Sequence, residues 1–199
     1  MHPNQVKLHL GSSSPRRKEL LSTLGIPFSI VVPSVDERVR SGENPEHYLE
    51  RVVNEKWRAA SSAVPRGEAV LVADTIVVLG DEILGKPENE AANVAMLELL
   101  AGRQHCVTTR YMVGAKKELL AVESVHTLVI FRDLAEAEMA RYVSTGEGLD
   151  KAGGYAIQGG AASFVKRIEG SYSNVVGLPL AEVTVALGRL GFFSSETSD

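Results

Sequence analysis

Hydrophobic and polar positions along this chain follow two periods, the alternation of β-strands and the three-to-four-residue recurrence of helices. Apolar and β-branched runs predict strands at Val6–Leu10, Phe28–Val32, Ala69–Ala73, Ile76–Leu79, Glu82–Leu84, Cys106–Val113, Glu123–Phe131 and Ser163–Ile168. Helices are predicted from Pro15 to near Gly25, from Pro45 onward, and over Glu88–Leu100, Leu134–Val143 and Leu180–Leu190. Because strands and helices alternate, the fold class is α/β with a mixed sheet, whose strand order the pattern does not predict.

Capping residues support two of these helix starts. Ser14 and Pro15 are the residue types preferred at an N-cap and at the first helical position. Asp133 and Glu136 have the spacing of a capping box before residues 134–143. We therefore expect both helices to begin at these residues.

Length and composition are those of a globular domain. The 199 residues are 44% hydrophobic and 23% charged, which are ordinary values. We expect one domain over residues 1–193 and a flexible tail over residues 194–199. With 21 Lys and Arg against 25 Asp and Glu, the formal net charge is −4, which argues against a nucleic-acid-binding protein. A polyphosphate ligand would need positive charge gathered at one site.

Three features predict a cytoplasmic protein without a membrane segment. The single cysteine, Cys106, cannot form an internal disulfide, which is compatible with a reducing compartment. Residues Met1–Gln5 do not resemble a signal peptide, because no apolar segment follows a basic one. The apolar stretch Ala69–Leu79 is interrupted by Asp74 and is too short to cross a bilayer.

The segment Ser12–Lys18 lies between a predicted strand and a predicted helix and is a candidate phosphate-binding site. Unpaired N–H groups and the helix dipole favour an anion at a helix N-terminus. Serine hydroxyls, Arg16 and Arg17 would add hydrogen bonds to phosphate oxygens. The alternative is an ordinary capped helix start whose arginines face solvent.

The segment Gly80–Lys86 matches the start of a P-loop. A P-loop continues with Ser or Thr, whose hydroxyl holds magnesium, whereas this chain has Pro87. Residues Glu82–Leu84 also have the pattern of a strand rather than of a phosphate-binding turn. We therefore reject a P-loop, and Lys86 is either a phosphate contact or an ordinary surface charge.

Asp74 lies within an otherwise apolar run. A buried carboxylate needs a cation, a metal or several hydrogen bonds, so an aspartate at a strand end beside a cleft is a candidate metal ligand or general base. The alternative is a turn between two strands, in which Asp74 binds nearby backbone groups. Glu37 is a candidate second carboxylate, and the five histidines lack the spacing of a zinc site.

Two glycine-rich segments, Gly153–Gly160 and Gly170–Pro179, would let a ligand approach the backbone closely. On composition alone they could also be long turns. Gln158 lies in the first of them, and we expect it to project from a strand end over a flexible loop.

These segments form an ordered series that is more specific than any one of its members. The series is Ser12-x-Ser14-Pro15-Arg16-Arg17, Asp36-Glu37, Asn54-Glu55-Lys56, Ala73-Asp74-Thr75, Gly85-Lys86-Pro87, Asp150-Lys151-Ala152-Gly153, Tyr155-x-Ile157-Gln158-Gly159 and Gly170-Ser171-Tyr172-x-Asn174-Val175-Val176-Gly177-Leu178-Pro179. Taken together, they resemble the Maf family of nucleoside triphosphate pyrophosphatases, nearly from end to end.

The resemblance implies an elongated α/β fold with flanking helices and a cleft between two lobes, similar to inosine triphosphatases. It implies hydrolysis of a nucleoside triphosphate to the monophosphate and pyrophosphate with a divalent cation, Mg²⁺ or Mn²⁺. Glu37 and Asp74 would hold the metal, and Asp74 would be the proton acceptor. In the branch of the family that acts on dTTP and UTP, the specificity positions match Arg16, Thr75 and Gln158.

The reaction that the resemblance implies needs positive charge around the triphosphate. The candidate phosphate-binding residues are Ser14, Arg16, Arg17, Lys56 and Lys86. The Gln158 amide can meet the N3–H donor and O4 acceptor of uracil or thymine with two hydrogen bonds. Discrimination against cytosine then requires a neighbour, such as Thr75 or a loop backbone group, that holds the amide in one orientation.

Two other functions stay open at this point. A purine-directed enzyme similar to inosine triphosphatases would share the cleft, and a panel of nucleotides would distinguish it. A non-catalytic regulator of cell division would act through a protein partner and would not need carboxylates and cations placed together. The sequence also leaves open whether the chain forms a homodimer.

Overall fold

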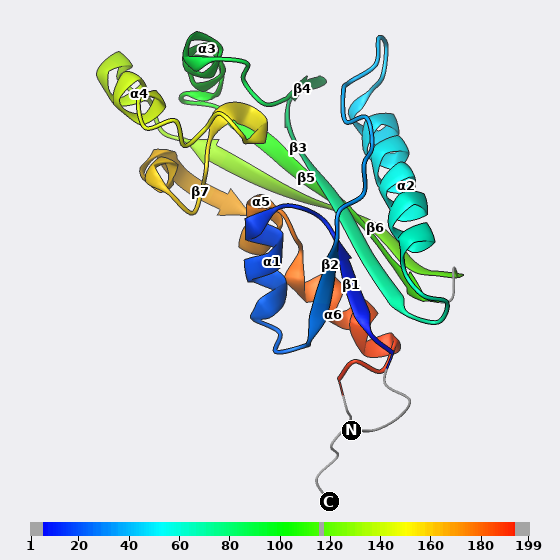
Figure 1. Ribbon diagram of the computed structural model, residues 1–199. Helices are drawn as coiled ribbons and strands as arrows, with labels where there is room; N and C mark the ends of the chain where they lie inside the picture. Colours follow the sequence, from blue (N-terminus) through cyan, green and yellow to red (C-terminus); the bar gives the residue numbers. More distant parts are fainter. Residues whose placement is uncertain (1–5, 116–117, 194–199) are drawn as a thin grey trace, which may run out of the picture.

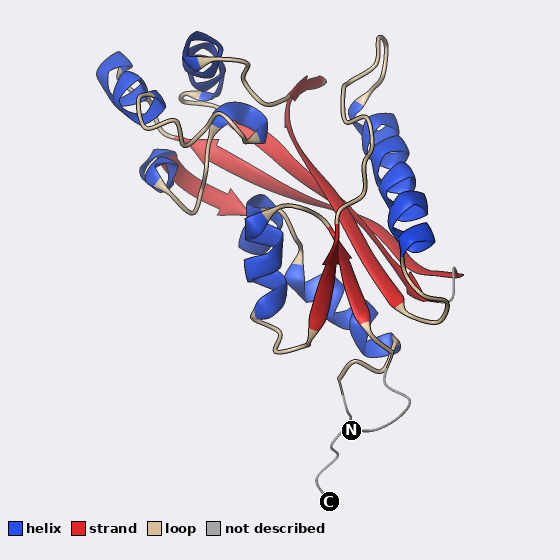
Figure 2. Cartoon of the chain, viewed as in Figure 1, coloured by secondary structure: helices blue, strands red, loops and turns tan. Residues whose placement is uncertain are grey.

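The computed structural model describes residues 6–115 and 118–193, in which seven strands form one sheet (Figures 1 and 2). The strands are β1 (Leu8–Gly11), β2 (Phe28–Val31), β3 (Ala69–Leu79), β4 (Glu82–Leu84), β5 (Gln104–Ala115), β6 (Glu118–Phe131) and β7 (Val165–Glu169). The helices are α1 (Pro15–Ser22), α2 (Pro45–Ala63), α3 (Glu90–Leu100), α4 (Glu136–Val143), α5 (Tyr172–Val176) and α6 (Leu180–Arg189), with 3₁₀ turns η1 (Ala152–Gly154) and η2 (Gly160–Phe164). The predicted class, α/β with a mixed sheet and flanking helices, is confirmed.

The strand order is β2-β1-β3-β5-β6-β7, with β4 paired to the end of β3. β1 is parallel to both of its neighbours, and the other pairs are antiparallel. β3 is nearly continuously apolar and buried, which is typical of a strand covered on both faces. β1 stops opposite Val72, and β4 joins β3 only at Val77. Within the described residues, the β3 edge between these two points has no strand beside it.

Helices cover both faces of the sheet (Figure 1). On one face α2 packs its apolar stripe, which includes Leu49 and Val52, against Ile76 of β3. On the other face α1, α5 and α6 contribute to the main core. Because side chains alternate along a strand, Asp74 reaches α2 and its neighbour Thr75 reaches α1. Two adjacent residues of β3 therefore point to opposite faces of the sheet.

The far end of the sheet, below α3 and α4, holds an aromatic cluster. His105 and Phe131 of the sheet pack edge-to-face with each other and with Tyr155 from the loop after η1. Phe164 of η2 joins Phe131 and the α4 residue Tyr142. This cluster supports the loop that carries the glycine-rich segment around residue 158.

Several boundaries differ from the predicted ones. Residues 69–79 form one strand, so Asp74 lies in mid-strand rather than at a strand end or in a turn. α4 begins at Glu136 after Ala135, whose N–H donates to Glu138 at 3.1 Å, so the capping box predicted at Asp133 is wrong. Met1–Gln5 and the predicted tail, 194–199, lie outside the described residues. None of the helices in the described ranges combines the length and hydrophobicity needed to span a membrane.

Candidate functional site

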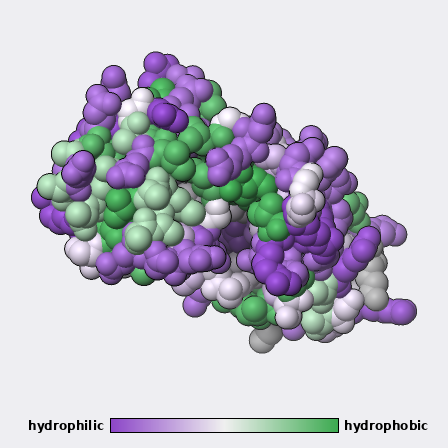
Figure 3. Space-filling view, turned by 90° about the horizontal axis from the view of Figure 1, so that it is seen from above, coloured by the Kyte–Doolittle hydropathy of each residue, from purple (hydrophilic) through white to green (hydrophobic). Residues whose placement is uncertain are grey.

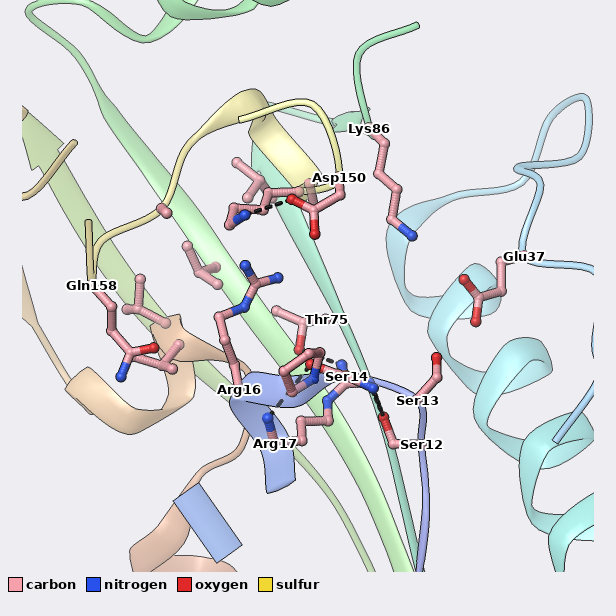
Figure 4. Close-up of a pocket in the computed structure, with 18 of the residues that line it drawn as sticks. Ser12, Ser13, Ser14, Arg16, Arg17, Glu37, Thr75, Lys86, Asp150 and Gln158 are labelled. Atoms are coloured by element: carbon pink, nitrogen blue, oxygen red, sulfur yellow. Dashed lines mark hydrogen bonds and ion pairs between the residues drawn. The ribbon is translucent and has the colours of Figure 1, made fainter. Parts of the chain in front are cut away.

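A pocket of about 340 Å³ opens at the unpaired edge of β3, and a hydrophilic hollow between two halves of the molecule is visible in the space-filling view (Figure 3). The structure brings nearly all the predicted site residues to this pocket. Ser14, Arg16, Arg17, Glu37, Lys56, Thr75, Lys86 and Gln158 line it, and Asp74 lies directly behind Lys56. Glu37 and Gln158 stand on opposite sides (Figure 4). After the roles expected from the sequence, we call the part built from residues 12–17, Glu37, Lys56 and Asp74 the phosphate end, and the loop 155–160 the base end.

Arg17 is a buried cation in the wall of the pocket. Its Nε donates to the carbonyl of Gly177 at 2.8 Å and its Nη2 to Thr75 Oγ1 at 2.9 Å. Gly177 presents that carbonyl from a backbone with φ of 129°, a conformation that favours glycine. Burial lowers the pKa of the guanidinium, and the charges of Asp74 and Glu37 partly offset this effect. No carboxylate in the part of the chain that the structure describes forms an ion pair with it.

The turn between β1 and α1 has the geometry predicted for an anion site. Ser14 is the N-cap, and its Oγ accepts from the N–H of Arg17. The side chain of Ser12, which begins the predicted phosphate-binding segment, is buried and accepts from the N–H of Ser14 at 3.1 Å. Because both serines use an oxygen lone pair in these bonds, each hydroxyl still has a proton to donate.

Lys56 connects the two predicted metal ligands. Its Nζ lies 2.6 Å from Asp74 Oδ1 and 2.7 Å from Glu37 Oε1, and its side chain is only 7% exposed. Sequence reasoning placed Lys56 on the phosphates, whereas in the structure it neutralises both carboxylates. Burial raises the pKa of the Glu37 carboxyl, but the charge and hydrogen bond of Lys56 outweigh burial, so the pKa is lowered.

Arg16 and Lys86 complete the cationic lining. Arg16 is half-buried on α1, and Lys86 is exposed in the loop after β4. Both point into the pocket (Figure 4), and neither forms an ion pair with a described residue. The carbonyl of Gly85 accepts from the N–H of Gly153 at 3.0 Å, so the loop of Lys86 is tied to η1. As predicted, Glu82–Leu84 is a strand and not a P-loop.

The surroundings of Thr75 and Gln158 bear on base recognition. The hydroxyl of Thr75 contacts Arg17 and, at 2.9 Å, Thr109, and no hydrogen bond between described residues joins it to the Gln158 amide. Gln158 lies in the turn between η1 and η2 rather than at a strand end. The reason is local, since Gly159 and Gly160 follow it and disfavour a continued strand.

Asp150 and Lys151 are pocket residues to which sequence reasoning gave no role. Their side chains form an ion pair, and Lys151 also donates to the carbonyl of Glu147 at 2.6 Å. The hydrogen bond from Lys151 lowers the pKa of the Asp150 carboxyl. An acid–base pair directly before a glycine-rich segment was the signal that could have identified them.

Residues 7–190 match the family model described as Maf-like protein. The dTTP/UTP pyrophosphatase of Anaeromyxobacter dehalogenans is 50% identical over 189 residues, which are 94% of this chain and 95% of the relative. That of Desulfotalea psychrophila is 50% identical over 188 residues, covering 94% and 96%. That of Myxococcus xanthus is 46% identical over 191 residues, covering 96% of each.

Solved structures with a related arrangement are more distant. The nucleoside-triphosphatase, or dITP/XTP pyrophosphatase, from Mycobacterium abscessus has a TM-score of 0.41 and 16% identity, over 63% of this chain and 74% of that one. The Ham1 protein of Staphylococcus aureus has a TM-score of 0.40 and 14% identity, over 65% and 72%.

Proposed function

This chain belongs to the Maf family, and from that premise we propose that it hydrolyses dTTP and UTP to the nucleoside monophosphate and pyrophosphate. The three relatives described above carry this activity in their names, and the matches cover nearly their whole length. The reaction cleaves the bond between the α- and β-phosphates. It therefore needs a site that binds a triphosphate and delivers water to the α-phosphorus.

The buried guanidinium of Arg17 is the observation that carries the proposal. A buried cation without a carboxylate partner is costly, and an anion in the pocket would remove that cost. Arg16, Lys86 and the hydroxyl of Ser14 face the same pocket. A chain with a net charge of −4 thus gathers positive charge at one place, which suits a triphosphate.

We further propose that Glu37 and Asp74 hold a divalent cation, Mg²⁺ or Mn²⁺. The two carboxylates already converge on one positive charge, the Lys56 ammonium, and Mg²⁺ is commonly held by one or two carboxylates together with phosphates. The described residues contain no group of three His, Cys, Asp or Glu that could hold the ion alone, so phosphate oxygens would complete the site. When bound, the metal would neutralise phosphate oxygens and acidify a coordinated water.

Asp74 is the proposed proton acceptor. Its Oδ1 accepts from Lys56, whereas none of the hydrogen bonds between described residues uses Oδ2. The carboxylate is held on a central strand and is only 7% exposed, so its orientation is fixed before substrate binds. Oδ2 would take the proton of the attacking water. Lys56 would hold the carboxylate in place, and its positive charge would favour the negative charge that develops on the phosphates.

Gln158 is the proposed reader of the base. Its amide can accept from N3–H and donate to O4 of uracil or thymine, which cytosine presents in reverse. A site built for one pattern rejects the other because buried polar groups are left unpaired. A purine-directed enzyme would not need this pyrimidine pattern, and a regulator of division would not need the cations and carboxylates of the phosphate end.

The test is pyrophosphate release from a panel of common and modified nucleoside triphosphates, with Mg²⁺, with Mn²⁺ and with EDTA. We expect dTTP and UTP to be hydrolysed well, CTP and dCTP poorly and purines least, with no activity in EDTA and recovery when metal is added. A preference for inosine or xanthosine triphosphate would contradict the proposed substrate. Activity that persists in EDTA would contradict the metal.

We also infer a cytoplasmic location, because free nucleoside triphosphates are substrates of that compartment. The single cysteine of the chain is compatible with its reducing conditions. Fractionation of cells that express the tagged full chain checks this.

A further inference from the structure

Gln158 depends on its backbone for its position. Its side chain is exposed, and no hydrogen bond between described residues uses its amide. The turn around it is held by one backbone group on each side. The N–H of Ala156 donates to Tyr142 Oη at 2.9 Å, and the N–H of Gly160 donates to the Glu147 carboxylate at 2.9 Å. Together with the backbone hydrogen bond from the N–H of Gly159 to the carbonyl of Ala156 at 3.1 Å, these two side chains hold the turn that carries Gln158.

Glu147 contacts the turn a second time, at Gly159. A Cβ at Gly159 would come within 1.8 Å of Glu147 Oε1 and 2.4 Å of Cδ. The φ of Gly159 is −122°, outside the positive range in which glycine is favoured. The missing side chain is what lets the carboxylate reach the N–H of Gly160.

Two hydrogen bonds hold the backbone of Glu147. Its N–H donates to Thr145 Oγ1 at 3.2 Å, and its carbonyl accepts from Lys151 Nζ at 2.6 Å. Lys151 lines the pocket, whereas Glu147 does not. Glu147 thus acts from behind the pocket, between Lys151 and the turn that carries Gln158.

We propose that Glu147 is a positioning residue for Gln158, and that the preference for dTTP and UTP over CTP depends on the Glu147 carboxylate and on the absence of a side chain at Gly159. The proposal rests on the function proposed above. It differs from a purely structural role, because loss of the anchor would alter the choice between pyrimidines more than it alters the stability of the fold.

The experiment compares kcat/KM for dTTP, UTP and CTP in wild type, Glu147→Ala, Glu147→Gln and Gly159→Ala, with thermal unfolding of each. Small displacements of a positioning group can cost up to about a hundredfold, so for Glu147→Ala and Gly159→Ala we expect about a tenfold loss for dTTP and UTP. The kcat/KM for CTP should change less, so the ratio of kcat/KM for dTTP or UTP to that for CTP should decrease. Glu147→Gln should keep most of this ratio, because its amide oxygen can accept from the N–H of Gly160.

Two further variants complete the test. Glu136→Ala is the matched control, since Glu136 is an exposed glutamate of α4 with no side-chain hydrogen bond among the described residues, and it should change nothing. Glu147→Ala combined with Gln158→Ala should be no worse than Gln158→Ala alone, because the anchor acts only through the amide. If Glu147→Ala does not fold, Gly159→Ala tests the same contact from the other side.

The outcomes separate the two proposals. A wild-type protein that hydrolyses neither dTTP nor UTP would refute the proposed function. A wild type with the expected preference, whose Glu147→Ala and Gly159→Ala variants fold and keep that preference, would refute the positioning role alone. An equal loss for all three nucleotides, or additive losses in the double variant, would also refute it.

Discussion

At the phosphate end of the pocket the buried charged side chains are held by partners, whereas at the base end the Gln158 side chain has no partner in the described part of the chain and only its backbone is anchored. Lys56 joins Asp74 and Glu37, and Arg17 is fixed by Gly177 and a hydroxyl. The Gln158 side chain has no such partner among the described residues. The phosphate end of the pocket is therefore organised before substrate binds. At the base end, the amide of Gln158, the proposed base-reading group, has no hydrogen-bond partner among the described residues.

The difference follows from the cost of burying each kind of group. A buried charge loses several kcal/mol of hydration unless partners replace it, so charges at the phosphate end need a fixed network. A neutral amide at the surface keeps its hydration until the base displaces it, so it needs only to be placed. Substitutions at the phosphate end should therefore change catalysis more than substitutions at the base end.

The largest effect is expected for Asp74→Asn. General base catalysis contributes about 10²–10⁴ to the rate, and an amide cannot accept the proton, so kcat should fall by about that factor. Lys56 keeps its ion pair with Glu37 in this variant, so the fold should persist with some loss of stability. Pyrophosphate release and thermal unfolding measure the two effects.

Asp81→Asn is the matched control, because Asp81 is exposed in the turn between β3 and β4. It should leave kcat unchanged. An Asp74→Asn protein with full activity would remove Asp74 from the mechanism.

The next effect is a loss of folding stability in acid that involves His105, in the aromatic cluster that supports the base end. Burial lowers the pKa of His105 from 6.5 to about 4, and its Nδ1 is buried without a partner among the described residues. Between these values the unfolded chain binds a proton that the folded chain does not. Stability should therefore fall as the pH drops from about 6.5 to about 4, by about 3 kcal/mol, and this contribution should level off below pH 4.

Urea unfolding at several pH values measures this loss in wild type and in His105→Gln. The variant should have a flatter dependence over this range, whereas His47→Gln, on an exposed turn of α2, should match wild type. Equal slopes for wild type and His105→Gln would show that another group causes the loss.

The sequence predicts the elements of this fold better than it predicts which of them meet. Apolar and β-branched runs located every strand, although they divided β3 into two, because that signal is local. Asp74 was expected at a strand end, because a polar residue interrupts an apolar run there. The pocket forms beside it because a different strand, β1, ends there, and strand order is not a local property.

The site shows the same limit. The motifs include most of the charged and polar residues that line the pocket, but they do not reveal the partners of those residues. Lys56 was expected to contact phosphate, and its pairing with Asp74 depends on α2 packing over β3. Likewise, only the folded chain places Glu147 against Gly160, since the residues between them must first form η1 and the turn.

The effect expected for Gln158→Glu is smaller than those expected for Asp74→Asn and for the protonation of His105. A carboxylate accepts from N3–H but repels O4, so kcat/KM for dTTP and UTP should fall about tenfold, the value of one lost hydrogen bond plus repulsion. The kcat/KM for CTP should fall less, so the ratio of kcat/KM for dTTP or UTP to that for CTP would decrease. If the variant keeps the full preference for dTTP and UTP over CTP, another group reads the base.

The smallest effect is expected for Lys86→Ala. This variant tests whether the fixed network of the phosphate end extends to the exposed edge of the pocket, where Lys86 lies. Lys86 is exposed, faces the pocket and has no ion pair with a described residue, so solvent and salt screen its charge. Exposed charges contribute little, so KM should rise about two- to fivefold with kcat unchanged, and the difference from wild type should shrink at high salt. Lys166→Ala, an exposed lysine of β7 outside the pocket, is the matched control and should leave KM unchanged. A fall in kcat that persists at high salt would instead show that Lys86, like Arg17, belongs to the fixed network and contacts the phosphates in the transition state.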